Sequence, residues 1–394
     1  MTFLRLEEPS QPPVTGLPLL RLGFRPFYLL AALFAAVAVP LWLAALTGHA
    51  RLPWAGAAWH AHEMLFGFAA AVIAGFLLTA VRNWTGADTI AGAPLGALAT
   101  LWVAGRLAPW FLPGWAAAVT DILFLPLAAW AVAHPLIKAR NRRNTFVPCL
   151  LLAMALLNIA WHGLVNRDPF WAMTLLKLQL GLIATLMSVI AGRVVPMFTR
   201  NAIAGVRQTS HPWIERASAP LTLIGWSAWV LSPHSAWLAA PLAGIALMHG
   251  VRLIGWGALA TARKPILWIL HVSCAFAALA FAAAAADCLS LAPASLAIHV
   301  LAVGGMGGLI IGMVTRTARG HTGRPLTAGR TECLAYACLV AATLLRTVPL
   351  ILPAPGGYLA WLDAAAVAWS AAFAVYFIRY LPWLSAPRVD GKPG

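Results

Sequence analysis

Apolar residues in this chain form long unbroken runs, such as Leu29–Leu46 and Phe66–Val81. Outer-membrane barrels show instead short segments in which apolar and polar residues alternate. About 20 apolar residues in a helix span a bilayer, and a helix satisfies its own backbone hydrogen bonds in lipid. The pattern therefore predicts an all-α polytopic membrane bundle of about 12 transmembrane helices. Their expected ranges are 24–46, 60–81, 94–112, 115–136, 146–165, 170–195, 217–232, 235–258, 265–287, 291–315, 329–352 and 357–381.

The connections between these expected helices are short, so no soluble domain is inserted. The sequence predicts one transmembrane domain over residues 24–382, between an N-terminal tail (1–23) and a C-terminal tail (383–394). Residues 1–18 are polar, acidic and proline-rich. Because they lack the basic start and apolar core of a signal peptide, we expect a cytoplasmic tail there.

Composition and charge agree with a membrane protein and add an orientation. Hydrophobic residues make up 61% of the chain, charged residues 10%, and the mean hydropathy is +0.82. The net charge of +16 comes from Lys and Arg scattered through short loops. With a cytoplasmic N-terminus, nearly all basic loop residues lie inside, and only Arg51 and Arg167 lie outside. The positive-inside rule then places both termini in the cytoplasm and the protein in the inner membrane, and nucleic-acid binding is disfavoured.

The cysteines exclude several cofactor classes. None of the five takes part in a C-x-x-C, a C-x-x-C-H or a Cys/His zinc pattern. We therefore expect no covalently attached c-type haem, no iron–sulfur centre and no disulfide scaffold.

The eleven histidines carry the candidate chemistry, because an ionisable group inside a membrane is costly and usually functional. His60, His62, His162 and His299 all fall in the outer half of the predicted membrane and could converge on one site. Neutral imidazole binds iron and copper well, so the pattern suits a haem or a transition metal. The alternative is that each histidine only hydrogen-bonds a neighbouring helix, or that His60 caps its helix.

His60 and His62 are about 200° apart on a regular helix, so both cannot point at one metal. One of them could lie on a non-helical entry turn, or one could bind and the other orient. Glu63, the next residue, could accept a hydrogen bond from a ligand histidine or carry protons. Arg106 and Asp121 also fall within predicted helices, where paired ions and a proton route are both open interpretations.

The inner half of the predicted membrane holds a second pair, His249 and His271, at similar depth on consecutive helices. His321 lies in a cytoplasmic loop. Gly304, Gly308 and Gly312 form a stripe that indicates either close helix packing or room for a flat macrocycle. Arg193, Arg252 and Arg316 are either topology anchors or partners for haem propionates.

Several motifs together resemble the NnrS family. They are the segments Trp59–Phe68, Arg193–Thr199, Leu267–His271, His299–Arg316 and Gly320–Pro325, which occur in order along nearly the whole chain. The resemblance implies a bacterial membrane protein of twelve helices that contains haem and copper and takes part in nitric oxide metabolism, denitrification and tolerance of nitrosative stress. The positions carried over from its motifs are His60, His62, Glu63, His271, His299 and His321.

Three hypotheses follow. The first is an oxidoreductase acting on nitric oxide through non-covalent b-type haem and copper, with quinol in the bilayer as a candidate electron donor. The second is a metal or haem transporter, and the third is a haem-based sensor or assembly factor without turnover. For the first we expect catalytic roles for His62, Glu63 and His299. The expected cofactor contacts are His249, His271, His299, His321, Arg193, Arg252 and Arg316. The expected metal ligands are His60, His62, His162, His249, His271 and His299.

Overall fold

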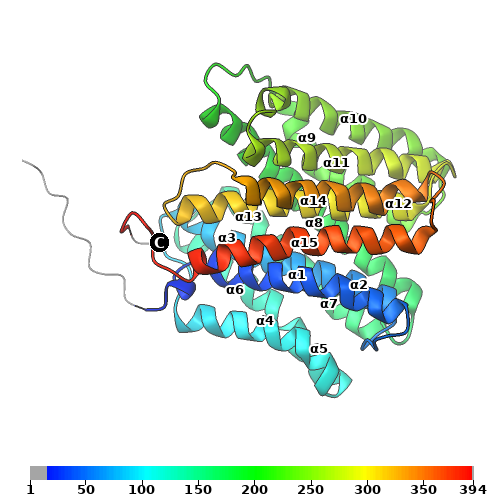
Figure 1. The fold of residues 1–394 in the computed structure, drawn as a ribbon, viewed down its shortest axis with the longest axis horizontal. Helices are drawn as coiled ribbons and strands as arrows, with labels where there is room; N and C mark the ends of the chain where they lie inside the picture. The colour runs from blue at the N-terminus through cyan, green and yellow to red at the C-terminus, as the bar shows by residue number, and fades with distance from the viewer. Residues whose placement is uncertain (1–15, 393–394) are drawn as a thin grey trace, which may run out of the picture.

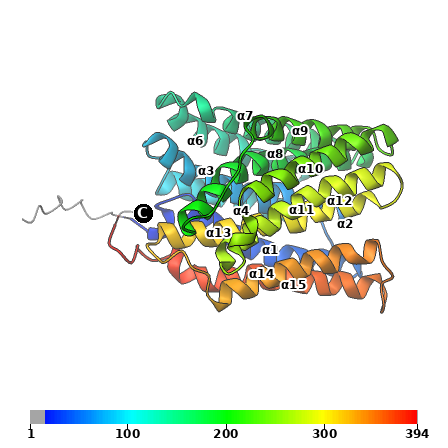
Figure 2. The same ribbon diagram turned by 90° about the horizontal axis from the view of Figure 1, so that it is seen from above.

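The computed structural model describes residues 16–392, which form helices and loops with no strand among them (Figure 1). Most helices run back and forth along one common direction and pack side by side (Figures 1 and 2). In the described part of the chain, ten helical stretches are long and apolar enough to cross a membrane. They are α1 (Phe24–Leu46); α2 (Gly56–His62) with η2 (Glu63–Ala69) and α3 (Ala70–Thr85); α5 (Gly114–Ile122) with α6 (Phe124–Lys138); η3 (Arg142–Asn144) with α7 (Phe146–Leu164); α8 (Pro169–Ala202); η4 (Ala236–Leu238) with α10 (Ala239–Gly255); α11 (Pro265–Cys288); α12 (Ala294–His299) with η6 (Val300–Gly307) and α13 (Gly308–His321); α14 (Arg330–Thr347) with η7 (Val348–Leu350); and α15 (Tyr358–Leu384).

The prediction of an all-helical, multi-pass membrane fold is confirmed. The remaining two predicted segments are also helical, as α4 (Ala93–Phe111) and α9 (Pro212–Leu231), but they are not among the ten. Both carry charge: Arg106 lies in α4, and α9 begins early enough to include Glu215 and Arg216. That these two helices also cross the membrane stays a prediction, as does the cytoplasmic position of the termini.

The first and last helices close the bundle. α1 packs beside α15, and both lie between α14 and the α4–α6 region (Figure 1). Nη1 of the buried Arg25 donates to the carbonyl oxygens of Leu384 and Ala386, each at 2.8 Å. The start of α1 and the end of α15 therefore lie together at one end of the molecule.

Two spans are interrupted by π-helical segments, which the sequence did not predict. η2 follows His60 and His62 directly, and η6 follows His299 directly. A π-helix is rare and occurs frequently at functional sites, because its wider turn redirects the side chains on either side of it. Both interruptions thus coincide with the histidines singled out in the sequence.

The glycine stripe on η6 and α13 serves close packing against α11. A Cβ atom on Gly304 would lie 2.6 Å from the Phe276 ring, and one on Gly312 would lie 2.6 Å from Leu270. Side chains of α11 occupy the space that a macrocycle would need. Of the two alternatives, helix packing is the one that this geometry favours.

Candidate metal and cofactor sites

His60 and His62 point into two different environments. The ring of His60 stacks on Trp42 of α1, with centroids 4.3 Å apart. The ring of His62 stacks on Trp161 of α7, with centroids 4.0 Å apart. α2 is a regular helix up to His62, so the angular separation of the two side chains divides them between opposite sides.

On one side of α2, His62 meets Asp121 of α5 and His162 of α7. Each offers one ligand atom, and the three atoms lie within 4.8 Å of one another. Oδ2 of Asp121 is 2.8 Å from Nε2 of His162 and 3.3 Å from Nε2 of His62. We call this group the polar cluster. It is the only such group of metal-binding side chains in the described residues.

Buried polar side chains surround the polar cluster. Arg106 of α4 pairs with Oε2 of Glu63 at 2.7 Å and also contacts Oδ1 of Asp121. Nδ2 of Asn158 donates to Oδ2 of Asp121 at 2.8 Å. Oε1 of Glu63 is 3.1 Å from Nδ1 of His62, and this contact fixes the orientation of the ring.

The charges of this region do not cancel. Glu63 and Asp121 are 2% and 3% exposed and have a combined formal charge of −2, whereas Arg106, 8% exposed, has a formal charge of +1. An uncompensated charge in a low-dielectric interior is costly, so the region favours one more positive charge. A proton on an imidazole would supply it, and so would a metal ion bound by the imidazole and carboxylate ligands. The polar cluster therefore fits a transition metal such as copper.

On the other side of α2, His60 lines a mainly apolar cavity of about 290 Å³. We call it the His60–His299 cavity, because His299 of α12 also lines it, together with Trp42, Arg346 of α14 and Trp369 of α15. Nδ1 of His60 is buried and has no hydrogen-bond partner among the described residues. A buried nitrogen without a partner is unusual in a folded protein, and an absent ligand is one explanation.

The two ring nitrogens of His299 have different partners, and Nε2 is the one that faces Arg346. Nδ1 of His299 lies 2.7 Å from the carbonyl oxygen of Ser295 and must donate to it, because that oxygen can only accept. Nε2 then carries a lone pair, 3.2 Å from Nη2 of Arg346. Two imidazoles in one apolar cavity, with a guanidinium beside them, fit haem iron and a haem propionate.

The four outer histidines thus divide between two neighbouring sites and do not converge on one. His62 and His162 belong to the polar cluster, and His60 and His299 to the cavity. The ligand Asp121 was identified in the sequence only as an intramembrane charge, and Asn158 was missed. An amide in an apolar helix is a weak signal, because it more often serves helix packing.

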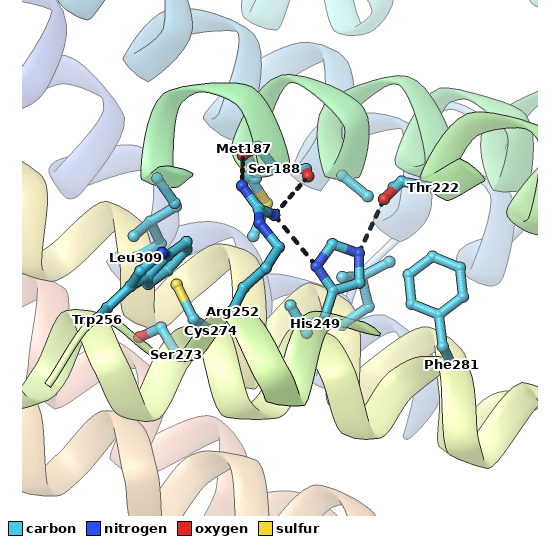
Figure 3. Close-up of a pocket in the computed structure, with 14 residues that line it drawn as sticks. Met187, Ser188, Thr222, His249, Arg252, Trp256, Ser273, Cys274, Phe281 and Leu309 are labelled. Atoms are coloured by element: carbon cyan, nitrogen blue, oxygen red, sulfur yellow. Dashed lines mark hydrogen bonds between the residues drawn. The ribbon is translucent and has the colours of Figure 1, made fainter. Parts of the chain in front are cut away.

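The inner histidines are not paired with each other in the structure. Nε2 of His249 is 2.9 Å from Oγ1 of Thr222, and its Nδ1 is 3.3 Å from Nη1 of Arg252 (Figure 3). Nε2 of His271 is 2.9 Å from Oγ1 of Thr199, while its Nδ1 is buried without a described partner. His271 does not line the small cavity, about 30 Å³, around His249. Both engage neighbouring helices, and a cofactor role for either stays a prediction.

The remaining predicted residues lie elsewhere. Arg193 and Arg252 line a separate cavity near the ends of α8 and α10. The guanidinium of Arg316 sits over the Phe198 ring, 3.9 Å from its centroid. The ring of His321 packs against Phe24, with centroids 5.5 Å apart. None of these four lines the His60–His299 cavity.

The family model for the NnrS protein matches residues 18–388, nearly the whole chain. The chain belongs to the NnrS family. No curated protein matches it. NnrS membership suggests a haem- and copper-associated membrane protein of nitric oxide metabolism, which agrees with the resemblance seen in the sequence. In this NnrS chain, the polar cluster is a possible His/Asp metal site.

Proposed function

We propose that this NnrS protein binds haem and copper in the bacterial inner membrane and uses them to bind nitric oxide and convert it to a less toxic product. One observation carries the proposal. A single helix, α2, presents one histidine to an apolar cavity with a second histidine and another histidine to a His/Asp cluster. Two metal-competent sites therefore lie on opposite sides of one short helix.

His60 and His299 would hold haem, with Arg346 available to a propionate, and His62, Asp121 and His162 would hold copper. Bound there, the two groups would supply redox-active metals able to bind nitric oxide and to accept and donate electrons. The donor types fit these assignments, since imidazole suits both iron and copper and a carboxylate adds charge compensation at the polar cluster.

The protein's own residues prepare each site. Trp42 stacks on the ring of His60 and limits its rotation, and the Ser295 carbonyl selects the tautomer of His299. Apolar side chains line most of the cavity and exclude water. Nitric oxide is small, uncharged and soluble in lipid, so an apolar cavity within the bilayer is accessible to it.

Glu63 and Arg106 hold charge next to the polar cluster. Glu63 contacts Nδ1 of His62, and His62 and His162 both contact Asp121. This continuous series of titratable groups ends at His162, which also lines a cavity of about 480 Å³ shared with Trp54 and Arg167. With copper held by His62, Asp121 and His162, Glu63 is the carboxylate left free of the metal, and it would hold or move a proton at Oε1, next to Nδ1 of His62.

The decisive test measures the metal content and optical spectrum of the detergent-purified protein. We expect a haem Soret band and copper in the wild type. His60→Ala and His299→Ala should lose haem and keep copper, whereas His62→Ala and His162→Ala should lose copper and keep haem. His211→Ala, at an exposed loop position, is the matched control. A metal-free wild type, or full haem in both cavity variants, would contradict the assignment.

Activity separates the proposal from its alternatives. Nitric oxide should shift the Soret band, and a reduced quinol should support its consumption. A Soret shift without consumption would indicate a sensor or an assembly factor. Movement of metal or haem across vesicles by the purified protein, without consumption of nitric oxide, would indicate a transporter.

A further inference from the structure

Arginines gather around a cavity of about 700 Å³ where α8 and α10 end and α9 begins. This is the end of the bundle where the distribution of basic residues places the cytoplasm. One acidic residue, Glu215, also lines the cavity, so its lining carries an excess of positive charge. We call it the arginine cavity. Its arginines are Arg143, Arg193, Arg200, Arg216 and Arg252.

The arginines are graded in depth. Arg143, Arg200 and Arg216 are exposed, Arg193 is partly buried, and Arg252 is 5% exposed. Among the described residues, the only ion pair that these five form joins Arg252 to Glu215, at 2.8 Å. A hollow lined by one sign of charge concentrates ions of the opposite sign. The arginine cavity is therefore arranged to draw an anion inward from its mouth.

The inner wall of the cavity is built around Arg252. Its Nη2 donates to the carbonyl oxygen of Ser188 at 3.1 Å, and its Nη1 lies 3.0 Å from Oγ of Ser188 (Figure 3). Gly192 on α8 makes room for it, since a Cβ atom there would collide with Nη2. The guanidinium is thus held in one position by α8 and by Glu215 of α9, and needs little reordering to meet a ligand.

The loop between α8 and α9 forms another wall. Nε2 of Gln208 donates to the carbonyl oxygens of Pro196 and Trp256, both at 2.9 Å. The backbone nitrogen of Thr209 donates to the carbonyl oxygen of Gly255 at 2.9 Å. These bonds tie the loop to the ends of α8 and α10, so the cavity has a defined shape.

Two simpler roles fit the arginine cavity less well. Topology anchors point outward to lipid headgroups, whereas these five side chains converge on one hollow. Haem propionates would need an iron ligand facing the same hollow, and no histidine, cysteine, methionine or tyrosine is among the described residues of the lining. His249 lies 3.3 Å from Nη1 of Arg252, but it lines the separate cavity of about 30 Å³, which is too small for haem. Several guanidinium groups around a polar hollow are instead typical of phosphate recognition, because each guanidinium can donate two parallel hydrogen bonds to phosphate oxygens.

We propose that the arginine cavity binds a ligand through a phosphate group. The ligand is either a soluble phosphorylated molecule from the cytoplasm or the headgroup of an anionic phospholipid. This proposal is independent of the haem and copper sites; the His60–His299 cavity is lined by Met173 and Leu180, which lie toward the other end of α8. The sequence suggested haem propionates as partners of Arg193 and Arg252; we propose a phosphate group in their place.

The test compares two pairs of substitutions in the full-length, detergent-purified protein. Arg200→Gln/Arg216→Gln removes two exposed arginines from the cavity mouth. Arg142→Gln/Arg207→Gln removes two exposed arginines next to lining residues but outside the lining, and so is matched in charge. The probes are inorganic pyrophosphate and dioctanoyl phosphatidylglycerol, and the readouts are the rise in thermal unfolding temperature and calorimetric titration.

We expect at least one probe to bind the wild type saturably, and the cavity pair to weaken that binding at least tenfold. The control pair should change it less than threefold. Preference for pyrophosphate would identify a soluble ligand, and preference for phosphatidylglycerol a lipid. If neither probe binds saturably, the proposal is overturned. Equal weakening of probe binding by the two pairs of substitutions would also overturn it, since that would show a general charge effect.

Discussion

The two sides of α2 each carry a histidine, but the two histidines lie in opposite environments. On the His60 side, the imidazole lies against an apolar cavity, and one of its nitrogens is buried without a described partner. On the His62 side, both ring nitrogens have partners among carboxylate and amide groups. The first side is poor in hydrogen bonds and open to a ligand, whereas the second is rich in hydrogen bonds and has an excess of negative charge.

This difference shows that the two-residue spacing of His60 and His62 on α2 directs them into two kinds of cofactor environment. An apolar cavity with few polar groups suits a large, mostly apolar group such as haem. A compact group of oxygen and nitrogen ligands with a surplus negative charge suits a small cation. The following substitutions test whether the two sides are independent, from the largest expected effect to the smallest.

Arg106→Met should have the largest effect, because it leaves Glu63 and Asp121 buried without their shared guanidinium. Removing one partner of a buried ion pair costs about 3–5 kcal/mol. We expect a large drop in the thermal unfolding temperature of the purified protein, and partial recovery in the double variant Arg106→Met/Glu63→Gln.

Arg346→Met is the matched control on the other side of α2. Arg346 contacts a tyrosine hydroxyl, a serine hydroxyl and an imidazole, but no described carboxylate. Its loss should therefore cost only about 1.5–3 kcal/mol, the range of hydrogen bonds to a charged group. If Arg346→Met destabilises the protein as much as Arg106→Met, the contrast between the two sides is wrong.

Gly67→Ala tests the π-helical segment that borders the polar cluster. A Cβ atom on Gly67 would lie 2.8 Å from the Phe34 ring and 2.9 Å from Oε2 of Glu63. Overpacking of this kind costs roughly 1–3 kcal/mol, so the unfolding temperature should fall. Gly163→Ala, on α7, is the control, because a Cβ atom there meets nothing within 4 Å. It should be neutral or stabilise by up to about 1 kcal/mol.

Asn158→Ala should affect only the polar cluster. It removes the amide that donates to Asp121 and contacts Nε2 of His62. Loss of a group that orients metal ligands lowers metal affinity about 10–100-fold. We therefore expect weaker copper binding in a competition titration and an unchanged haem content. A parallel loss of haem would show that the two sides are coupled.

The sequence predicted the helical membrane fold well, because long apolar runs indicate directly which segments can lie in lipid. It also predicted that His60 and His62 cannot both point at one metal from a regular helix, since the helical angle depends only on spacing. The division of the four outer histidines was not predictable, because depth fixes position along the membrane normal but not around the bundle. Asp121 approaches His62 only because α5, α7 and α2 pack together, which no local pattern encodes.

Ser295→Ala should have the smallest effect and tests what holds His299 in place. The Ser295 hydroxyl lies 3.2 Å from Nδ1 of His299, but the closer contact, at 2.7 Å, is to the backbone carbonyl, which alanine keeps. The tautomer of His299 should therefore persist. The hydroxyl also accepts from Nη2 of Arg346 at 3.3 Å, and the loss of these two long contacts should cost about 0.5–1.5 kcal/mol in total. We expect the wild-type haem content and Soret position in this variant. Haem loss comparable to that of His299→Ala would show that the hydroxyl, and not the carbonyl, sets the orientation of the ring.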